Sequence, residues 1–394
     1  MTIRRDTSDF FSSPQGAAIL KHQLLKTYLG AFTGKLGLTS GGHVHLIDGY
    51  AGPGRYHDGS PGSPALALET ARLLQRSRTI HGAFIESDPD HYRRLLELLE
   101  AEELADGWMV KNGLAEDLLP DLVAGCGDGP LLVFLDPYGL TVPFGTLVEI
   151  VLNRPRRVLN APVGTTRLTT EVIMNFSVSA VRRMAGWATK PDLENDQQQK
   201  TARTFGARLD DFLGGDWWRD IYERHGGDPD WVPHAFREYC KRLRDASTRK
   251  GWHSFPIEVS DTYRGGIAYY LVLFTMSPHG TWSFNDAASL GTEALRRWTD
   301  DRSGEMRMES IDDDYLVATI ADNIEAALDE IGPFELGMKI GKVYGETLGE
   351  AREKHVRKAV KQLHKQGRLR RDPTGMKTLI DYLAMRPAAP ADTP

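Results

Sequence analysis

The sequence is poor in features that mark several classes of protein. Its 394 residues contain only two cysteines, Cys126 and Cys240, which lie too far apart to suggest a disulfide framework or a zinc site. No apolar run approaches the ~20 residues of a membrane-spanning helix, and Met1–Ser13 lacks the apolar core of a signal peptide. We therefore expect a soluble cytoplasmic protein, long enough for two or three domains.

A general excess of positive charge is also missing, since the formal net charge is -6. This balance argues against a uniformly basic surface for nucleic acid. The charge is unevenly distributed, however, because residues 300–330 hold eleven acidic and two basic residues. Residues 351–371 hold nine Lys or Arg residues and a single acid, Glu353. A local basic patch towards the C-terminal end therefore remains compatible with the composition.

The most informative stretch is HVHLIDGYAGPGRY, residues 43–56. A short apolar run rich in β-formers ends in an acid and passes at once into a glycine-rich loop, as a buried parallel strand does when it leads into a ligand-binding turn. The spacing D-x-x-x-G-x-G differs from the G-x-G-x-x-G of dinucleotide-binding folds. It resembles the first motif of class I S-adenosylmethionine-dependent methyltransferases, and this resemblance implies a ligand with a cationic amino-acid end. The candidate cofactor-binding residues of this loop are Asp48, Gly49, Gly52 and Gly54.

Strands and helices are expected to alternate over the following residues. Strands are predicted at 44–47, 82–85, 108–111, 131–135 and 171–176, separated by helices that include 65–74, 91–103 and 144–152. Strands at 255–259 and 269–275 would form a closing hairpin after a helical insertion at 189–251. The pattern predicts an α/β fold with a Rossmann-like, seven-stranded sheet. The closing hairpin makes this sheet resemble that of class I methyltransferases. Ser63 is expected to cap the helix at 65–74.

Acidic and polar residues follow several of these strands. Glu86 ends the second predicted strand, where a carboxylate holds ribose hydroxyls in nucleoside-binding folds, whereas Asp88 suits a helix cap. Asn112 and Glu116 follow the third strand, beside the expected position of an adenine ring. Because parallel strands end at a common sheet edge, these side chains are expected to meet there.

The fourth strand ends in the tetrad DPYG. It resembles the D/N-P-P-Y/F motif of amino-group methyltransferases, in which the acid or amide accepts hydrogen bonds from the target amine and the aromatic ring stacks on its base. Here one proline is present and the aromatic residue stands one position early. On this resemblance Asp136 and Tyr138 are the candidate catalytic residues; a simple turn is the alternative.

A separate domain is expected near the C-terminal end. Helices predicted at 315–331, 335–348 and 350–367, with a small hairpin formed by 368–372 and 376–382, follow the order of a winged helix-turn-helix. The predicted organisation is a methyltransferase-like domain at 1–299, an acidic linker at 300–314, the winged helix-like domain at 315–386 and a tail at 387–394. The candidate nucleic-acid-binding residues of its third helix are Arg352, Lys354, Arg357, Lys358, Lys361 and Lys365.

Four blocks together resemble the bacterial three-Cys-motif partner protein (TcmP) family: IDGYAGPGRYHDGSPGSP, FIESDPDHYRRLLELLE, VFLDPYGLTVPF and IMNFSVSAVRR. The resemblance covers most of residues 10–280, although the basic insertion at 154–170 is longer than expected. It implies a methyltransferase-like fold, S-adenosylmethionine (SAM) as cofactor, and a three-Cys-motif partner similar to radical-SAM enzymes.

Three functions are compatible with these observations. The leading hypothesis is a SAM-dependent methyltransferase that acts on a nucleic-acid base or nucleotide amine. The alternative is a non-catalytic adaptor that binds SAM or DNA and docks the three-Cys-motif partner. A metal-dependent hydrolase would require Asp48, Glu86 and Asp136 to act as metal ligands, although their sequence contexts match no known metal motif.

Overall fold

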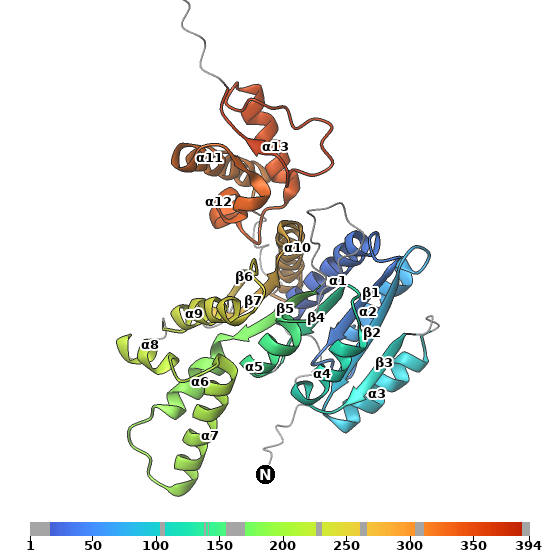
Figure 1. Ribbon diagram of the computed structural model, residues 1–394, viewed down its shortest axis with the longest axis vertical. Coiled ribbons are helices and arrows are strands. Elements are labelled where there is room, and N and C mark those ends of the chain that lie inside the picture. The colour runs from blue at the N-terminus through green and yellow to red at the C-terminus, as the bar shows by residue number, and fades with distance from the viewer. Residues whose placement is uncertain are drawn as a thin grey trace, which may run out of the picture. The chain divides into compact units, whose positions relative to one another are not determined.

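The structure, a computed structural model, describes residues 16–102, 107–137, 139–140, 142–154, 170–225, 231–260, 266–303 and 311–387 (Figure 1). Tyr138 and residues 155–169 of the predicted insertion lie outside the described residues. The chain divides into two compact units. The first comprises 29–276, and the second combines the chain from Ser277 onward with the start of α1 (Gly16–Gly37), up to Tyr28.

The first unit is built on a seven-stranded sheet, as predicted. Its order is β3-β2-β1-β4-β5-β7-β6. The first five strands are parallel, and β7 runs antiparallel to both of its neighbours. The strands are β1 (His43–Asp48), β2 (Thr79–Glu86), β3 (Trp108–Asn112), β4 (Leu131–Leu135), β5 (Thr170–Ser177), β6 (His253–Ser260) and β7 (Ile267–Thr275).

Helices alternate with the parallel strands because each connection must return to the starting edge of the sheet. The connecting elements are α2 (Ser63–Leu74), α3 (Pro89–Glu100), α4 (Ala115–Gly125), α5 (Phe144–Thr146) with the π-helical turn η1 (Leu147–Leu152), and α6 (Val178–Ala188). The predicted helix at 144–152 therefore changes to π geometry after Thr146. Buried residues of α4, η1 and α6 pack in one core with the sheet.

Two predictions about helix starts had different outcomes. Asp88 caps α3, since its side chain accepts hydrogen bonds from the backbone N–H groups of Asp90 and His91. Ser63 does not cap α2: it is the first residue of the helix, and Gly62 occupies the cap position. The Ser63 side chain is buried and interacts with Asp48, so tertiary packing rather than local capping explains it.

The predicted helical insertion forms α7 (Asp196–Leu213), α8 (Trp218–Arg224) and α9 (Trp231–Ala246), drawn in green to yellow in Figure 1. Trp218 and Trp231 are fully buried and lie 6.0 Å apart, ring centroid to centroid. These two rings therefore fill the core of this helical lobe.

The second unit contains α10 (Pro278–Ser303), α11 (Asp313–Ile331), the turns η2 (Leu336–Lys339) and η3 (Gly345–Thr347), α12 (Ile340–Tyr344) and α13 (Glu353–Lys365). A two-stranded sheet pairs β8 (Phe334–Glu335) with β9 (Leu383–Ala384). The predicted hairpin at 368–382 was wrong, because these residues form turns and the strand pairing joins segments on either side of α12 and α13. The winged-helix assignment stays a prediction.

The predicted boundary at residue 299 lies within α10, which continues to Ser303. Asp300 therefore belongs to a helix and not to a linker, and residues 304–310 lie outside the described part of the chain. At the other end of the predicted linker, Asp313 and Asp314 form the first turn of α11, capped by Asp312. Acids at a helix N-terminus are favoured by the helix dipole, which explains part of this acidic run.

Candidate functional site at the carboxyl edge of the sheet

The sheet brings together the predicted residues that end its parallel strands. Since β1 lies between β2 and β4, Asp48 pairs in register with Phe84 on one side and Phe134 on the other. Glu86 pairs with Asn112 of β3. Asp136 follows β4 directly, so these polar residues share the carboxyl edge of four neighbouring strands.

Asp48 is the most deeply buried of these acids, with 1% of its surface exposed. One carboxylate oxygen, Oδ1, accepts the Tyr50 N–H at 3.1 Å, whereas Oδ2 has no hydrogen-bond partner within the described structure. Burial raises the pKa of Asp48 to about 7, the Ser63 hydroxyl opposes the rise, and the charges of Asp136 and Glu86 add to it. The three predicted acids are thus close enough to repel one another.

Glu86 holds the glycine loop against the sheet. Its Oε2 accepts the Gly52 N–H at 2.8 Å, and its Oε1 accepts the Asp88 N–H at 2.7 Å. Burial raises the pKa of Glu86, and these two hydrogen bonds counteract the rise. Each oxygen retains a further lone pair that can accept a bond from a ligand.

The loop conformation depends on glycine at two positions. Gly52 and Gly54 have φ angles of 64° and 80°, in the left-handed region that other residues rarely adopt. A Cβ atom at Gly54 would also lie 2.5 Å from Leu98 Cδ2. At Gly49 the φ angle is ordinary, but a Cβ atom would lie 2.8 Å from Leu135 Cδ2. The D-x-x-x-G-x-G spacing therefore has a steric basis.

The two candidates for the adenine region lie on the same side of the site. The Asn112 side-chain amide donates to the Glu86 carbonyl oxygen at 2.8 Å, which ties β3 to the end of β2. Glu116 lies in the first turn of α4, and its charge adds to the burial that raises the pKa of Tyr50. Glu116 therefore lies near the residue that follows Gly49.

Asp136 is surrounded by polar groups that the sequence reasoning did not select. Its Oδ1 accepts a hydrogen bond of 2.8 Å from the side-chain amide of Asn175, which lies near the end of β5. Tyr56 and Tyr269 are buried, and the Asp136 charge adds to the burial that raises the pKa of each hydroxyl. Asp136 is thus held among an amide and two phenols.

Two of these three missed residues had a signal in the sequence. Asn175 is a polar residue within the apolar run VIMNF, near the carboxyl end of a strand, where ligand-binding residues of parallel sheets gather. Tyr56 follows the glycine loop within the resemblance block that was singled out. Tyr269 gave no signal, because only the antiparallel pairing of β7 with β5 brings it level with Ser177.

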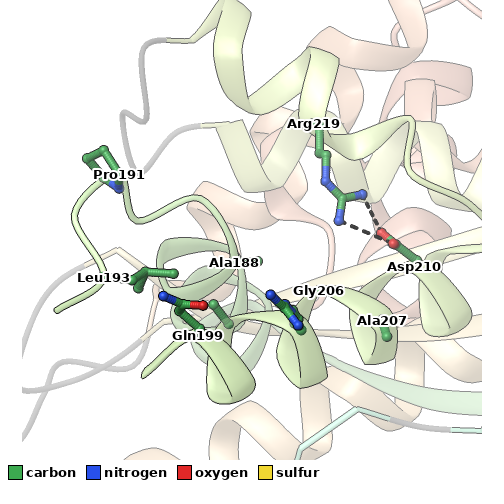
Figure 2. A pocket seen from close by; sticks show the side chains of 10 residues that line it. Ala188, Pro191, Leu193, Gln199, Gly206, Ala207, Asp210 and Arg219 are labelled. Carbon is green, nitrogen blue, oxygen red and sulfur yellow. Dashed lines mark hydrogen bonds and ion pairs between the residues drawn. The ribbon is translucent and has the colours of Figure 1, made fainter. Parts of the chain in front are cut away.

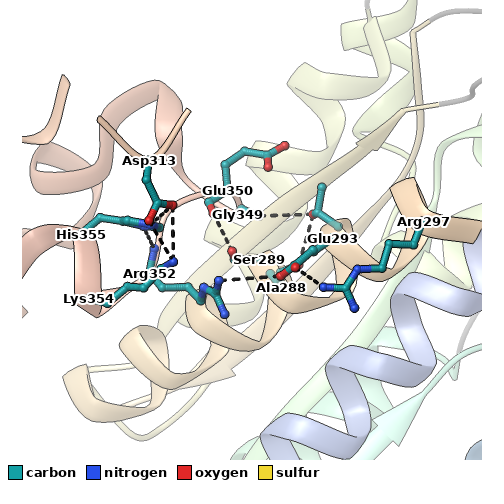
Figure 3. A network of polar contacts seen from close by, with 11 residues as sticks. Ala288, Ser289, Glu293, Arg297, Asp313, Gly349, Glu350, Arg352, Lys354 and His355 are labelled. Carbon is teal, nitrogen blue, oxygen red and sulfur yellow. Dashed lines mark hydrogen bonds and ion pairs between the residues drawn. The ribbon is translucent and has the colours of Figure 1, made fainter. Parts of the chain in front are cut away.

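The basic helix α13 is largely neutralised within its own unit (Figure 3). Asp313 pairs with Lys354 at 3.2 Å, with Lys358 at 3.4 Å and with the ring Nε2 of His355 at 2.9 Å. These contacts tie the start of α11 to the first half of α13. Two of the six predicted nucleic-acid-binding cations therefore already face a carboxylate.

Two further candidates have acidic partners as well. Arg357 pairs with Glu353 at 2.7 Å and donates to the Met376 carbonyl oxygen at 2.8 Å. Arg352, just before α13, lies 3.7 Å from Glu293 of α10. Lys361 and Lys365, on the last two turns, are exposed and have no ion pair with any described residue.

A cavity of about 640 Å³ lies in the helical lobe, away from the predicted residues (Figure 2). It is lined by residues of α7, by Ala188 at the end of α6 and by Arg219 of α8. Asp210 forms a bidentate ion pair with Arg219, with distances of 2.6 and 3.2 Å, and also accepts from the Trp218 ring N–H at 2.7 Å. The cavity is therefore nearly neutral, with Arg203 as its exposed cation.

No group of three or more His, Cys, Asp or Glu side chains within the described residues is arranged to hold a metal ion. None of the helices in the described ranges is long and apolar enough to span a membrane.

No protein-family model and no curated protein matches the sequence. Among solved structures, the chain is similar to the O-methyltransferase TomG from Streptomyces achromogenes in complex with SAM, with 14% identity, a TM-score of 0.30, and 70% of this chain and 92% of that chain covered. It is also similar to an O-methyltransferase from Bacillus cereus in complex with SAH, with 11% identity, a TM-score of 0.30, and coverage of 70% and 93%.

The first unit thus has the Rossmann-like, seven-stranded sheet of class I methyltransferases, defined by its strand order and by its antiparallel β7. Membership of the three-Cys-motif partner family remains a resemblance.

Proposed function

We propose that this protein is a SAM-dependent methyltransferase that acts on an amine of a nucleic-acid base or nucleotide. The observation that carries the proposal is the buried Asp48 oxygen without a hydrogen-bond partner in the described structure, which lies beside a loop that needs glycine at two positions and within reach of the charges of Asp136 and Glu86. A buried acceptor of this kind costs stability unless a ligand donor satisfies it. A cationic ligand would relieve both the missing hydrogen bond and the repulsion.

The residues at this edge fit such a cofactor. Asp48 and the backbone of Gly49, Gly52 and Gly54 would hold its cationic methionine end, and Glu86 would accept from the ribose hydroxyls. Asn112 and Glu116 would lie beside the adenine. When bound, SAM supplies an activated methyl group on a sulfonium centre. Glu86 is prepared for its role, since its contacts with Gly52 and Asp88 fix the orientation of the carboxylate.

Asp136 would bind the acceptor amine. Its carboxylate can accept a hydrogen bond from the amine and so orient the nitrogen lone pair, and positioning of this kind is the main protein contribution to a direct transfer. The Asn175 amide fixes the carboxylate, which is itself half-buried, and the buried Tyr56 and Tyr269 side chains lie close enough to sense its charge. Tyr138 is proposed on the DPYG resemblance to stack on the base. A base within a duplex would have to be flipped out.

Nucleic-acid contact by the second unit is part of the proposal. Lys361 and Lys365 are its best candidates, because phosphate binding there would not compete with an existing ion pair. Arg352, Lys354, Arg357 and Lys358 would first have to exchange a carboxylate for a phosphate. Cooperation with a three-Cys-motif, radical-SAM-like partner is proposed from the resemblance alone.

Calorimetry with SAM and with its demethylated product tests the cofactor assignment. We expect saturable binding of both at one site per chain, and an absence of heat with either at high protein concentration would overturn the enzyme proposal. Methyl transfer from labelled SAM to a nucleic-acid pool tests the acceptor, and Asp136→Ala should abolish it while SAM binding remains. Unchanged transfer in this variant would remove Asp136 from the acceptor site.

SAM binding without transfer to DNA, RNA or nucleotides would instead favour the non-catalytic adaptor. In that case the Asp136→Ala variant has no activity to lose, and the remaining question is whether SAM changes the affinity for a partner.

A further inference from the structure

A second cavity of the first unit, about 560 Å³ in volume, lies between α8, α9 and the edge strand β6. We call it the basic cavity, and define it by the six basic side chains that line it: Arg224, His225, His234, Arg237, Lys241 and Arg244. Four of them lie on α9 at intervals of three and four residues, so the helix presents them on one face. On the opposite wall, Ser254 and Pro256 belong to β6.

The acids around this cavity neutralise only part of its charge. Lys241 pairs with Asp245 at 2.8 Å, and Glu238, the acid in the lining, pairs with Arg242 at 2.9 Å. Arg224, Arg237 and Arg244 have no ion pair with a carboxylate among the residues that the structure describes.

Their described contacts are instead with neutral or basic groups. Arg224 donates to the Asp220 carbonyl oxygen, Arg237 contacts the ring Nδ1 of His234 at 3.0 Å, and Arg244 donates to the Ser254 hydroxyl. Three guanidinium groups that line one cavity without an ion pair to a described carboxylate repel one another. A bound anion would remove this cost.

The cavity of Figure 2 has no comparable excess of basic side chains among its described lining residues. There Asp210 neutralises Arg219 with two hydrogen bonds and leaves Arg203 as the exposed cation. Both cavities are of a size that holds small ligands, yet only the basic cavity gathers several arginines that are not paired with a described carboxylate. Arg203 therefore provides a matched control.

Arginine suits phosphate because its planar fork offers parallel N–H donors. Adjacent phosphates, as in a nucleic-acid strand, can engage two or three such groups together. Along the sheet, β6 lies three strand positions from β4, which corresponds to ~14 Å at ~4.8 Å per step. A strand with one base near Asp136 could therefore reach the basic cavity within a few nucleotides.

We propose that the basic cavity binds consecutive phosphate groups of a single-stranded nucleic acid whose target base lies at the carboxyl edge. This inference rests on the proposed function and specifies the form of its substrate. A single strand is favoured over a duplex because its flexible backbone can enter a concave site. Phosphate binding here would position the substrate without reading its sequence.

Fluorescence anisotropy with a labelled single-stranded DNA of about 15 nucleotides tests the proposal. The double variant Arg224→Ala/Arg237→Ala should bind about tenfold more weakly at low salt, and the salt dependence of log K should fall by about 1.4 for two lost contacts. Arg203→Ala removes the same kind of charge from the other cavity and should change affinity less than about twofold. Arg237→Lys should retain more binding than Arg237→Ala, since the charge remains.

Both substituted arginines are exposed, so the variant should keep the thermal midpoint and the circular dichroism spectrum of the parent. Inorganic tripolyphosphate should compete with the labelled strand in the parent protein but not in the double variant. A double variant that binds the strand as the parent does would overturn the proposal. So would binding of tripolyphosphate alone, with no affinity for the strand, because the cavity would then be a site for small polyphosphates.

Calorimetry with SAM separates this proposal from the one on which it rests. The double variant should bind SAM as the parent does, since neither arginine belongs to the carboxyl edge. If the parent binds the strand through Arg224 and Arg237 but gives no heat with SAM, the cofactor assignment fails and the phosphate site stands. If SAM binds and the arginines have no effect, the phosphate site fails alone.

Discussion

The carboxyl edge of the sheet and the basic helix α13 both carry clustered charge, but they differ in how far neighbouring groups of opposite charge compensate it. At the edge, three acids lie close together, and Asp48 is buried with one oxygen unsatisfied. On α13, most cations are paired with nearby carboxylates, and Asp313 alone serves Lys354, Lys358 and His355. Charge that the fold leaves uncompensated marks a ligand site more reliably than a high density of charge does.

The largest effect that tests this contrast is expected from Asp48→Asn. The pKa of Asp48 is raised to about 7, so the folded protein holds this proton more tightly than the unfolded chain does. The contribution of Asp48 to stability should therefore be greatest below pH ~4 and fall as the pH rises to ~7, by on the order of 4 kcal/mol. The substitution should abolish this dependence and stabilise the protein at pH 8, while it weakens SAM binding.

Urea unfolding at several pH values measures the effect, with Asp121→Asn, an exposed acid on α4, as the control. If the Asp48 variant and the parent lose stability equally between pH 5 and pH 8, the carboxyl group is not strained in the folded state. The contrast with α13 would then disappear.

A smaller effect is expected from Gly54→Ala, which tests whether the loop geometry is required. The positive φ angle and the close approach to Leu98 should together cost about 1–3 kcal/mol and should remove SAM binding. Gly186→Ala in α6 is the control, because a Cβ atom there meets nothing within 4 Å and a helical alanine should stabilise by ~0.5–1 kcal/mol. Normal SAM binding by the Gly54 variant would contradict the loop assignment.

For the basic helix, the corresponding test is Asp313→Asn, which should leave Lys354 and Lys358 without their carboxylate partner. The pKa of Asp313 is lowered to about 2, first by its hydrogen bond with His355 and further by Lys354. Its stabilising contribution is therefore present above pH ~4 and is lost as the pH falls towards 2, and at half exposure it amounts to ~1 kcal/mol or less.

Since Lys354 and Lys358 lose their carboxylate in this variant, its affinity for duplex DNA should rise several-fold at low salt. Asp314→Asn, which changes an exposed neighbour, should have little effect. Unchanged DNA affinity in the Asp313 variant would indicate that α13 does not face nucleic acid.

The smallest effect is expected from Lys361 and Lys365, the two lysines of α13 that have no ion pair with a described residue. Lys361→Ala and Lys365→Ala should each weaken duplex binding about threefold and together reduce the salt slope by about 1.8. Lys354→Ala should do less, because its charge is already compensated. Electrophoretic mobility shifts at several salt concentrations measure the difference, and an equal loss in all three variants would show that the internal ion pairs do not matter.

Much of the first unit could be predicted from local sequence. Apolar runs such as 131–135 must be buried strands, and their alternation with helices allows few arrangements other than a parallel sheet. The acids Asp48, Glu86 and Asp136 could be assigned to one edge for the same reason. Short elements were harder to predict. The pairing of β8 with β9, for example, links residues separated by two helices, and no local sequence pattern indicates it.

The sequence by itself determined the sheet, its glycine loop and the polar residues at the strand ends, because periodicity, glycine spacing and strand direction are local properties. Only the tertiary structure decided which charges are compensated. Ser63 contacts Asp48, and Asn175 contacts Asp136. Asp313 pairs with Lys354 and Lys358 of α13, and three arginines of α8 and α9 line one cavity beside β6 without an ion pair to a described carboxylate. Coulomb interactions depend on distance in space, and residues far apart in the chain set that distance only when the fold is complete.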